Sequence, residues 1–404
     1  MTHPIENDAR LGRRGRAWPA EFRAVVGLLR CALGTADTLS AFAGDGALRP
    51  GVLNALLGRH RIGAFLRHRL PAAERSRLPA PVQAHLDQAA QETARRALVR
   101  SAELVRLSRL LTAADVAFLS VKGPLLAQAL YGGLEVRHAG DLDLFVRPEQ
   151  LAAADATLRA AGYRRSMPDF DLTPRQWREF QRLKNDFEYL NVRGDLRVEV
   201  EWRLAGLSEL TFADEQARGE STILGREKIL RLSQETEFLY LFTHGAGHGW
   251  FRLFWLVDVA LLLQRQPHVD WPRLMKAARQ HGVETAVWQG TRLAEVLLGV
   301  PLPEALRVPA ARETSVRWLA SKAVRALLRS DRERAGVMEL FRQTRYQWHL
   351  SSGWSGKAAL LRPRLMSPTN WQALPLPDRW FGLYYAAAPF LWVRRRLGLK
   401  PRTR

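Results

Sequence analysis

Apolar positions in the first part of the chain recur at every third or fourth residue. Val25, Val26 and Leu29 show this spacing, which predicts a series of helices beginning near residue 20. The longest helix is expected to follow Pro81 and to run to about Leu111, because proline is tolerated in the first turn of a helix and breaks it further in. The N-terminal part of the chain is therefore expected to be helical.

The pattern changes at about residue 115. Two apolar runs of strand length, each followed by a segment with helical spacing, occupy residues 116–121 and 141–146. Residues 186–202 predict a β-hairpin with its turn at Arg193 and Gly194. Beyond about residue 205 the spacing is helical again.

These patterns predict an α+β fold, with a small mixed β-sheet and its flanking helices embedded between two helical regions. We expect a helical N-terminal region at 1–112, an α/β core at 113–204 and a helical C-terminal region at 205–404 that ends in a basic tail.

The net charge of the chain raises the question of what kind of partner it binds. Lysine and arginine number 61 against 40 aspartates and glutamates, a formal net charge of +21. One interpretation is a polyanionic partner such as nucleic acid, a nucleotide or an acidic membrane. The other, which we favour, is a general preference for arginine, because the arginines are spread along the sequence. Zinc-finger spacing and aromatic RNA-binding motifs are absent from the sequence, so nucleic acid is not the favoured partner.

The cysteine count and the lengths of the apolar runs exclude several classes of protein. Cys31 is the only cysteine, which excludes an intrachain disulfide and a cysteine-rich zinc site. No apolar run reaches the roughly 20 residues of a membrane span, and residues 1–20 are polar and arginine-rich, unlike a secretory signal. We therefore expect a cytoplasmic location. Aromatic residues and arginines at 380–400 could rest the C-terminal tail on an anionic membrane surface, although a helix packed on the protein with a basic end is the simpler interpretation.

Two aspartates are candidate ligands for a metal ion. Asp141 and Asp143 are separated by one residue in an expected strand, so both side chains point to one face. Carboxylates so placed repel one another unless a cation lies between them, and Mg²⁺ prefers oxygen ligands. Glu199 is the expected third ligand and Glu201 its rival, because strand alternation puts both on one face of the hairpin. The alternative for the aspartates alone is an exposed strand edge.

A Lys-Gly pair lies upstream of the aspartates. Gly123 allows backbone amides to approach a phosphate, and the helix that follows offers its positive end to an anion. Lys122 can pair with phosphate oxygens, and Arg137 could neutralise phosphate charge or hold the aspartates in place. The alternatives are a plain strand-to-helix connection and a surface arginine.

A later helix carries two histidines. His244 and His248 lie four residues apart and so share a face. They could bind a metal, contact substrate, or pack as structural histidines with Asp258 fixing a tautomer. We expect them to face the cleft of the middle region. Gly245 and Gly247, in the same helix, could admit a ligand or another chain segment, and tight helix–helix packing, which needs the same small residues, is the alternative.

Several ordered motifs together carry a resemblance. They are a Lys-Gly pair after an apolar strand, a helix ending in Leu-Tyr, an arginine, a D-x-D-L motif, a helix ending in Gly-Tyr, an acidic strand, and a helix with two histidines. The residues are Lys122, Gly123, Leu130, Tyr131, Arg137, Asp141, Leu142, Asp143, Leu144, Gly162, Tyr163, Glu199, Glu201, Trp202, His244, His248, Trp250 and Asp258. Over residues 50–300 they resemble a bacterial family described as uncharacterised nucleotidyltransferases, in the superfamily that includes DNA polymerase beta.

The resemblance implies a nucleotidyltransferase-like fold and activity. Such an enzyme would transfer a nucleoside monophosphate from a nucleoside triphosphate such as ATP to a hydroxyl or phosphate acceptor, releasing pyrophosphate, with Mg²⁺ or Mn²⁺ as cofactor. The acceptor would be an unidentified small molecule, peptide or protein. A non-catalytic nucleotide- or partner-binding accessory protein on the same fold is the alternative.

Roles for individual residues follow from the resemblance. Asp141, Asp143 and Glu199 would be catalytic and hold the metal. The expected nucleotide-binding residues are Lys122, Gly123 and Arg137, and the expected substrate contacts are Glu201, His244, His248 and Asp258. Glu201 stands where the family commonly has histidine, and the spacing from Gly123 to Asp141 is longer than in polymerase-like members. These departures leave open which glutamate completes the metal site.

Overall fold

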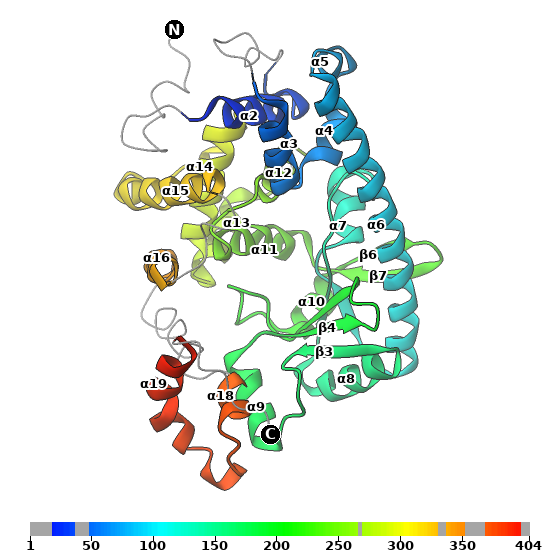
Figure 1. The fold of residues 1–404 in the computed structure, drawn as a ribbon, viewed down its shortest axis with the longest axis vertical. Helices are drawn as coiled ribbons and strands as arrows, with labels where there is room; N and C mark the ends of the chain where they lie inside the picture. The colour runs from blue at the N-terminus through cyan, green and yellow to red at the C-terminus, as the bar shows by residue number, and fades with distance from the viewer. Residues whose placement is uncertain (1–17, 37–47, 266–268, 330–336, 352–367, 397–404) are drawn as a thin grey trace.

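The computed structural model describes residues 18–36, 48–265, 269–329, 337–351 and 368–396 (Figure 1). Its centre is a seven-stranded mixed sheet with the strand order β3-β4-β5-β2-β1-β7-β6. β2 pairs in parallel with β5, as does β1 with β7, and the other neighbours are antiparallel. The strands are β1 (Phe118–Ser120), β2 (Leu142–Val146), β3 (Tyr163–Met167), β4 (Asp186–Asn191), β5 (Arg197–Glu201), β6 (Glu220–Leu224) and β7 (Glu227–Arg231).

The N-terminal helices lead into a long helix that runs beside the sheet. The longest, α6, has 34 residues, which corresponds to about 50 Å at the rise of an α-helix. Figure 1 shows it running beside the sheet from α4 and α5 to α8. The helices of this part are α2 (Ala20–Ala32), α3 (Pro50–His60), α4 (Gly63–Arg69), α5 (Ala72–Ser76) and α6 (Ala80–Ala113).

Short helices connect the strands and a larger set follows them. The connecting elements are α7 (Pro124–Leu126), the π-helix η3 (Ala127–Tyr131), η4 (Pro148–Gln150), α8 (Leu151–Ala160), α9 (Pro174–Leu183) and α10 (Phe212–Arg218). The later elements are α11 (Gln234–Gly247), α12 (Leu253–Arg265), α13 (Trp271–Gln280), α14 (Glu284–Leu298), η5 (Glu304–Leu306), η6 (Ala310–Arg312), α15 (Glu313–Leu328), α16 (Val337–Leu350), α18 (Pro368–Ala373), η8 (Asp378–Trp380) and α19 (Leu383–Arg396). A mixed sheet with flanking helices confirms the predicted α+β class.

Two strands lie where only helices were expected. β6 and β7 form a hairpin after residue 205, and β7 extends the sheet beside β1 through Ser120 and Arg231. The hairpin is largely exposed, so its sequence lacks the apolar alternation of a half-buried strand. Its base is fixed by tertiary contacts, because the buried Glu215 carboxylate accepts hydrogen bonds from the Ser233 backbone N–H at 2.8 Å and the Thr236 hydroxyl at 2.7 Å. The edge strand β3 was also not expected.

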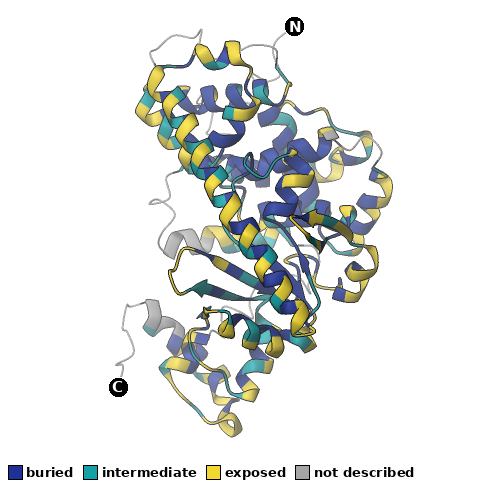
Figure 2. Cartoon of the chain, turned by 90° about the vertical axis from the view of Figure 1, so that its right-hand side faces the viewer, coloured by how far each residue is buried: buried dark blue, intermediate teal, exposed yellow. Residues whose placement is uncertain are grey.

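The two helical regions share one hydrophobic core. Side chains of α2 to α4 pack with those of α11 to α15, and Arg30 Nε donates to the Leu297 carbonyl at 2.9 Å. A second core lies between the sheet, α8, α9 and the C-terminal half of α6, and α18 and α19 add Trp371 and Tyr384 to it. Figure 2 shows buried residues filling both parts and exposed residues following one side of α6. The proposed division at residues 112 and 204 stays a prediction.

The remaining C-terminal expectations concern membranes. In the described part of the chain, no helix combines the length and apolarity that crossing a bilayer requires. Helix α19 ends at Arg396, and the rest of the expected basic tail, 397–404, lies outside the described residues. Contact of that tail with a membrane surface stays a prediction.

Helix α11 shows how tightly the helical core is packed. Phe238, Leu241 and Phe242 are buried, as its apolar stripe predicts. A Cβ added at Gly245 would lie 2.3 Å from Cζ3 of Trp250, whose ring is fully buried. Gly245 therefore serves helix packing and does not admit a ligand. Nothing lies within 4 Å of a Cβ added at Gly247.

The two glycines give a matched pair of substitutions. Gly245→Ala should lower the free energy of unfolding by roughly 1–3 kcal/mol, because the buried Trp250 ring has to shift. Gly247→Ala, at the exposed end of the same helix, should be neutral or stabilise by up to about 1 kcal/mol. Urea unfolding of both variants measures the difference. Equal effects would show that Trp250 does not constrain Gly245.

Candidate active site

Three carboxyl groups meet where β2 begins beside β5. The parallel register places Asp143 opposite Glu199, and Asp141, just before β2, points to the same side. Carboxylate oxygens of Asp141, Asp143 and Glu199 all lie within 4.8 Å of one another. The strand alternation therefore brings together the three side chains that the sequence pattern singled out.

The three carboxyl groups offer the donor atoms that a divalent cation binds. All three residues offer carboxylate oxygens, the ligands that Mg²⁺ and similar hard cations prefer. The Asp143 side chain is fully buried, and neither of its oxygens has a hydrogen-bond partner among the described residues. A buried carboxylate without such partners is costly unless a cation compensates it. A cation among the three groups would supply that compensation.

Electrostatics also favours a bound cation. Burial is the largest cause that raises the pKa of the Asp143 carboxyl; the charge of Lys122 opposes this effect and that of Asp141 adds to it. Burial also raises the pKa of Glu199, followed by the charges of Asp143 and Asp141. Without a cation the group therefore retains protons at a higher pH than isolated acids do.

Lys122 is the nearest basic side chain to the buried aspartate. Its Nζ lies 3.0 Å from Asp143 Oδ1 and forms an ion pair with it. Burial alone would lower the pKa of Lys122, but the charges of Asp143 and Tyr240 raise it well above its usual value. The ammonium group therefore stays charged at the wall of the site.

Glu201 lies apart from the three-carboxylate group. It is two residues further along β5, opposite Phe145, and its Oε1 accepts a hydrogen bond from the Tyr240 hydroxyl at 3.2 Å. Burial is the main cause that raises its pKa, with the charge of Asp143 next. The geometry therefore favours Glu199 over Glu201 as the partner of the two aspartates.

Two acids on the neighbouring strand escaped the sequence analysis. Asp186 and Glu188 of β4 pair with Glu201 and Glu199 and line the same cavity. Burial raises the pKa of Asp186, with the charge of Glu188 next. The sequence pattern could have identified them, because these acids alternate with Phe187 and Tyr189, which are fully buried.

The loop before the aspartates is held from two sides. Arg137 donates from Nε and Nη2 to the two oxygens of Asp258, each at 2.8 Å, and the Tyr131 hydroxyl donates to the same carboxylate at 2.5 Å. From α6, Arg100 Nη2 donates to the Gly140 carbonyl at 2.8 Å. These bonds fix the backbone that leads into Asp141.

Asp258 lies behind the wall of the site, in a buried pair. Its side chain is buried, lies outside the cavity lining and is occupied by Arg137 and Tyr131. Its described partners do not include the histidines, whose tautomer it was one candidate to fix, and its role as a substrate contact stays a prediction. The sequence pattern could not reveal this pairing, because Arg137 precedes Asp258 by 121 residues and spacing along α12 shows only local neighbours.

Gly123 adopts a backbone conformation that favours glycine, with φ of 75°. The helix that follows ends at Tyr131 as the sequence suggested, but only its first three residues, α7, are α-helical, and the rest form the π-helix η3. Its positive end is correspondingly weak. The Lys-Gly turn is therefore characterised by the backbone conformation of Gly123 and not by a strong helix dipole.

A cavity of about 560 Å³ opens over these groups. Its wall includes five acids, namely Asp141, Asp186, Glu188, Glu199 and Glu201, together with Lys122, Gly123, Arg137, Tyr240, His244, His248, Phe251, Phe254 and Trp255. Both histidines line it: the His244 and His248 rings lie 4.6 Å apart, and His248 stacks on Trp255 at 5.2 Å.

The histidines are less suited to binding a metal than the carboxylates. In the parts of the chain that the structure describes, no third His, Cys, Asp or Glu joins His244 and His248 in a metal-binding group. Burial, followed by the charge of Lys122, lowers the pKa of His244 well below its usual value, so its imidazole is neutral at pH 7. Their role as substrate contacts stays a prediction.

Comparison with known proteins agrees with the motifs. The model of the family described as "Uncharacterised nucleotidyltransferase" matches residues 48–299. No curated protein and no solved structure matches the chain. The matched range includes all the described strands, the three-carboxylate group and the cavity wall up to Trp255. The resemblance is thus confirmed, and the chain belongs to this family of uncharacterised nucleotidyltransferases.

Proposed function

We propose that this protein transfers a nucleotidyl group from a nucleoside triphosphate to an acceptor hydroxyl or phosphate, releasing pyrophosphate, and that the reaction depends on Mg²⁺ or Mn²⁺. The observation that carries this proposal is the convergence of Asp141, Asp143 and Glu199 beside a cavity that Asp141 and Glu199 line and that is large enough for a nucleotide. Family membership supports the reaction class. The base and the acceptor are left unassigned.

We assign the metal to the three carboxylates. Asp143 would be the central ligand because both of its oxygens are buried and lack hydrogen-bond partners among the described residues. When bound, a divalent cation here would neutralise phosphate charge and stabilise the attacking and leaving oxygens. Glu199 would also accept the proton of the acceptor, because its carboxylate lies within 4.8 Å of the other two ligands and lines the cavity.

Lys122 and Arg137 would hold the phosphates. Both line the cavity, and the ion pair with Asp143 keeps Lys122 charged. Arg137 uses Nε and Nη2 for Asp258, which leaves further N–H groups of the five-donor guanidinium for a phosphate. The open backbone at Gly123 would let the β1–α7 turn approach the same group.

Asp143→Asn should lower turnover by about 100-fold or more while the protein stays folded, because the amide keeps the shape of the side chain and loses the charge. The assay incubates each labelled nucleoside triphosphate with Mg²⁺ and follows pyrophosphate and a labelled product. Glu188→Gln removes a neighbouring charge outside the three-carboxylate group and should retain activity. Equal turnover in wild type and Asp143→Asn would favour the non-catalytic accessory role.

Metal binding can be separated from turnover by thermal unfolding. Saturating Mn²⁺ should raise the Tm of the wild type by about 2 °C or more, because a ligand that binds only the folded state stabilises it. Glu199→Gln should abolish this increase and Glu201→Gln should keep most of it. The opposite pattern would assign the third ligand to Glu201.

A further inference from the structure

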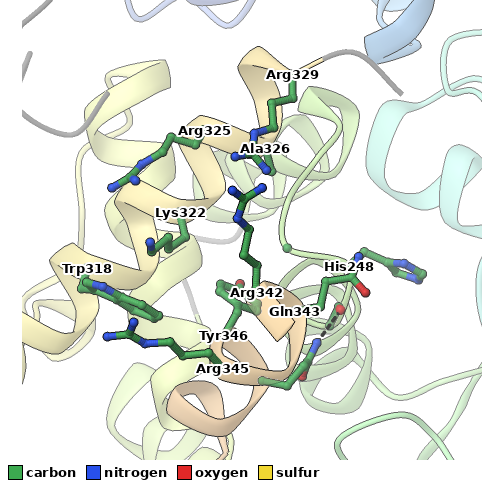
Figure 3. A pocket seen from close by; sticks show the side chains of 13 residues that line it. His248, Trp318, Lys322, Arg325, Ala326, Arg329, Arg342, Gln343, Arg345 and Tyr346 are labelled. Atoms are coloured by element: carbon green, nitrogen blue, oxygen red, sulfur yellow. Dashed lines mark hydrogen bonds between the residues drawn. The ribbon is translucent and has the colours of Figure 1, made fainter. Parts of the chain in front are cut away.

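A second cavity, of about 610 Å³, lies between α15, α16 and the turn after α11. Its wall carries five cationic side chains, namely Lys322, Arg325, Arg329, Arg342 and Arg345. Among the described residues that line it there is no aspartate or glutamate. In Figure 3, Arg342 extends from α16 toward Ala326 and Arg329 of α15. Although the arginines of the chain are spread along its sequence, the fold brings four of them to this cavity together with Lys322.

The two helices that carry the cations are fixed against the rest of the protein. The buried Tyr346 of α16 donates its hydroxyl hydrogen to Gln289 Oε1 at 2.8 Å, and Gln347 Nε2 donates to the Gly247 carbonyl at 2.7 Å. Lys322, Arg325 and Arg329 follow one another at helical spacing and so share one face of α15. The cations therefore converge on one hollow from two anchored helices.

Trp318 orders two of the charges. Lys322 Nζ lies 4.9 Å from the centre of its ring, and the Arg345 guanidinium lies 5.4 Å from it. Such cation–π contacts hold a charged group in place without neutralising it. Figure 3 shows Lys322, Trp318 and Arg345 grouped on one side of the cavity. The ring therefore positions the two cations and leaves their charges available to an anion.

The cations of this cavity lie close enough to act on one another. Burial, then the charges of Arg325 and Arg345 and those of Arg342 and Arg329, lower the pKa of Lys322. One turn earlier on α15, Arg317 pairs with Glu313 at 3.2 Å. The same helix thus compensates an arginine with an acid outside the cavity, whereas no acid is found among the described residues of its wall. Like charges gathered in one hollow are typical of an anion site.

We propose that this cavity binds a small ligand with several linked phosphates, as in inorganic tripolyphosphate or the 5′-triphosphate of a nucleoside. Arginine forks pair with phosphate oxygens through two parallel hydrogen bonds. A hollow of about 610 Å³ has the size of a small-molecule site, which favours such a ligand over a nucleic acid strand lying along a surface.

This site is separate from the three-carboxylate group. The two cavities share only the wall residue His248 among the described residues, and its imidazole points away from the basic side chains in Figure 3. The proposal therefore stands whether or not the protein catalyses nucleotidyl transfer.

Calorimetric titration with tripolyphosphate and, separately, with ATP tests the proposal. Both titrations contain EDTA, so that the acidic cluster has no divalent cation to attract phosphates. Wild type should bind at least one of the two, more weakly at higher salt. A Lys322→Gln, Arg345→Gln double variant should bind at least 10-fold more weakly. Arg317→Gln, the matched control on the same helix, should bind like wild type.

The comparison of ligands identifies the source of the phosphates. Equal binding of the two ligands shows that the linked phosphates are what the site recognises, and a strong preference for one of them identifies it as the ligand. If the double variant fails to fold, the exposed Arg325→Gln replaces it and should weaken binding as well. Absence of binding, unchanged binding in the cavity variants, or tighter binding of a short RNA than of both small ligands would overturn the proposal.

Discussion

Acidic side chains that share one face of two adjacent parallel strands cannot all ionise in a buried site without a cation. β2 and β5 impose this condition by placing Asp143 opposite Glu199, with Asp141 within reach of both. Burial, the largest cause of the raised carboxyl pKa values, makes the condition severe. Lys122 compensates it in part through its ion pair with Asp143. The metal dependence that we propose follows from this one constraint.

The surrounding fold maintains the constraint. β2 lies between the two hydrophobic cores, with Leu142 and Leu144 in one and Phe145 in the other. Asp143 shares a face with Phe145, so it points toward the helical part that contains α11. The buried Arg137–Asp258 pair and the bond from Arg100 to Gly140 hold the preceding loop against α12 and α6. The cavity is therefore built jointly by the sheet and the helices.

Strand alternation and the ordered motifs predicted the centre of the site from the sequence. Both are local patterns, and the parallel pairing of β2 with β5 placed their acids together. Asp186 and Glu188 obey the same alternation and could have been included. What local pattern could not reveal is tertiary: the partner of Asp258, the packing of Trp250 on Gly245, and the hairpin β6–β7, most of whose residues are exposed or only partly buried. The second cavity likewise depends on α15 and α16 meeting.

The most direct test of the metal site is to locate a bound cation. Crystals grown with Mn²⁺ and a non-hydrolysable nucleoside triphosphate analogue would be measured near the manganese absorption edge. The account predicts an anomalous peak ligated by Asp141, Asp143 and Glu199, with the phosphates of the analogue on the same ion. A peak at Glu201 or at His244 and His248 would contradict it, as would an analogue bound with no manganese at the three carboxylates.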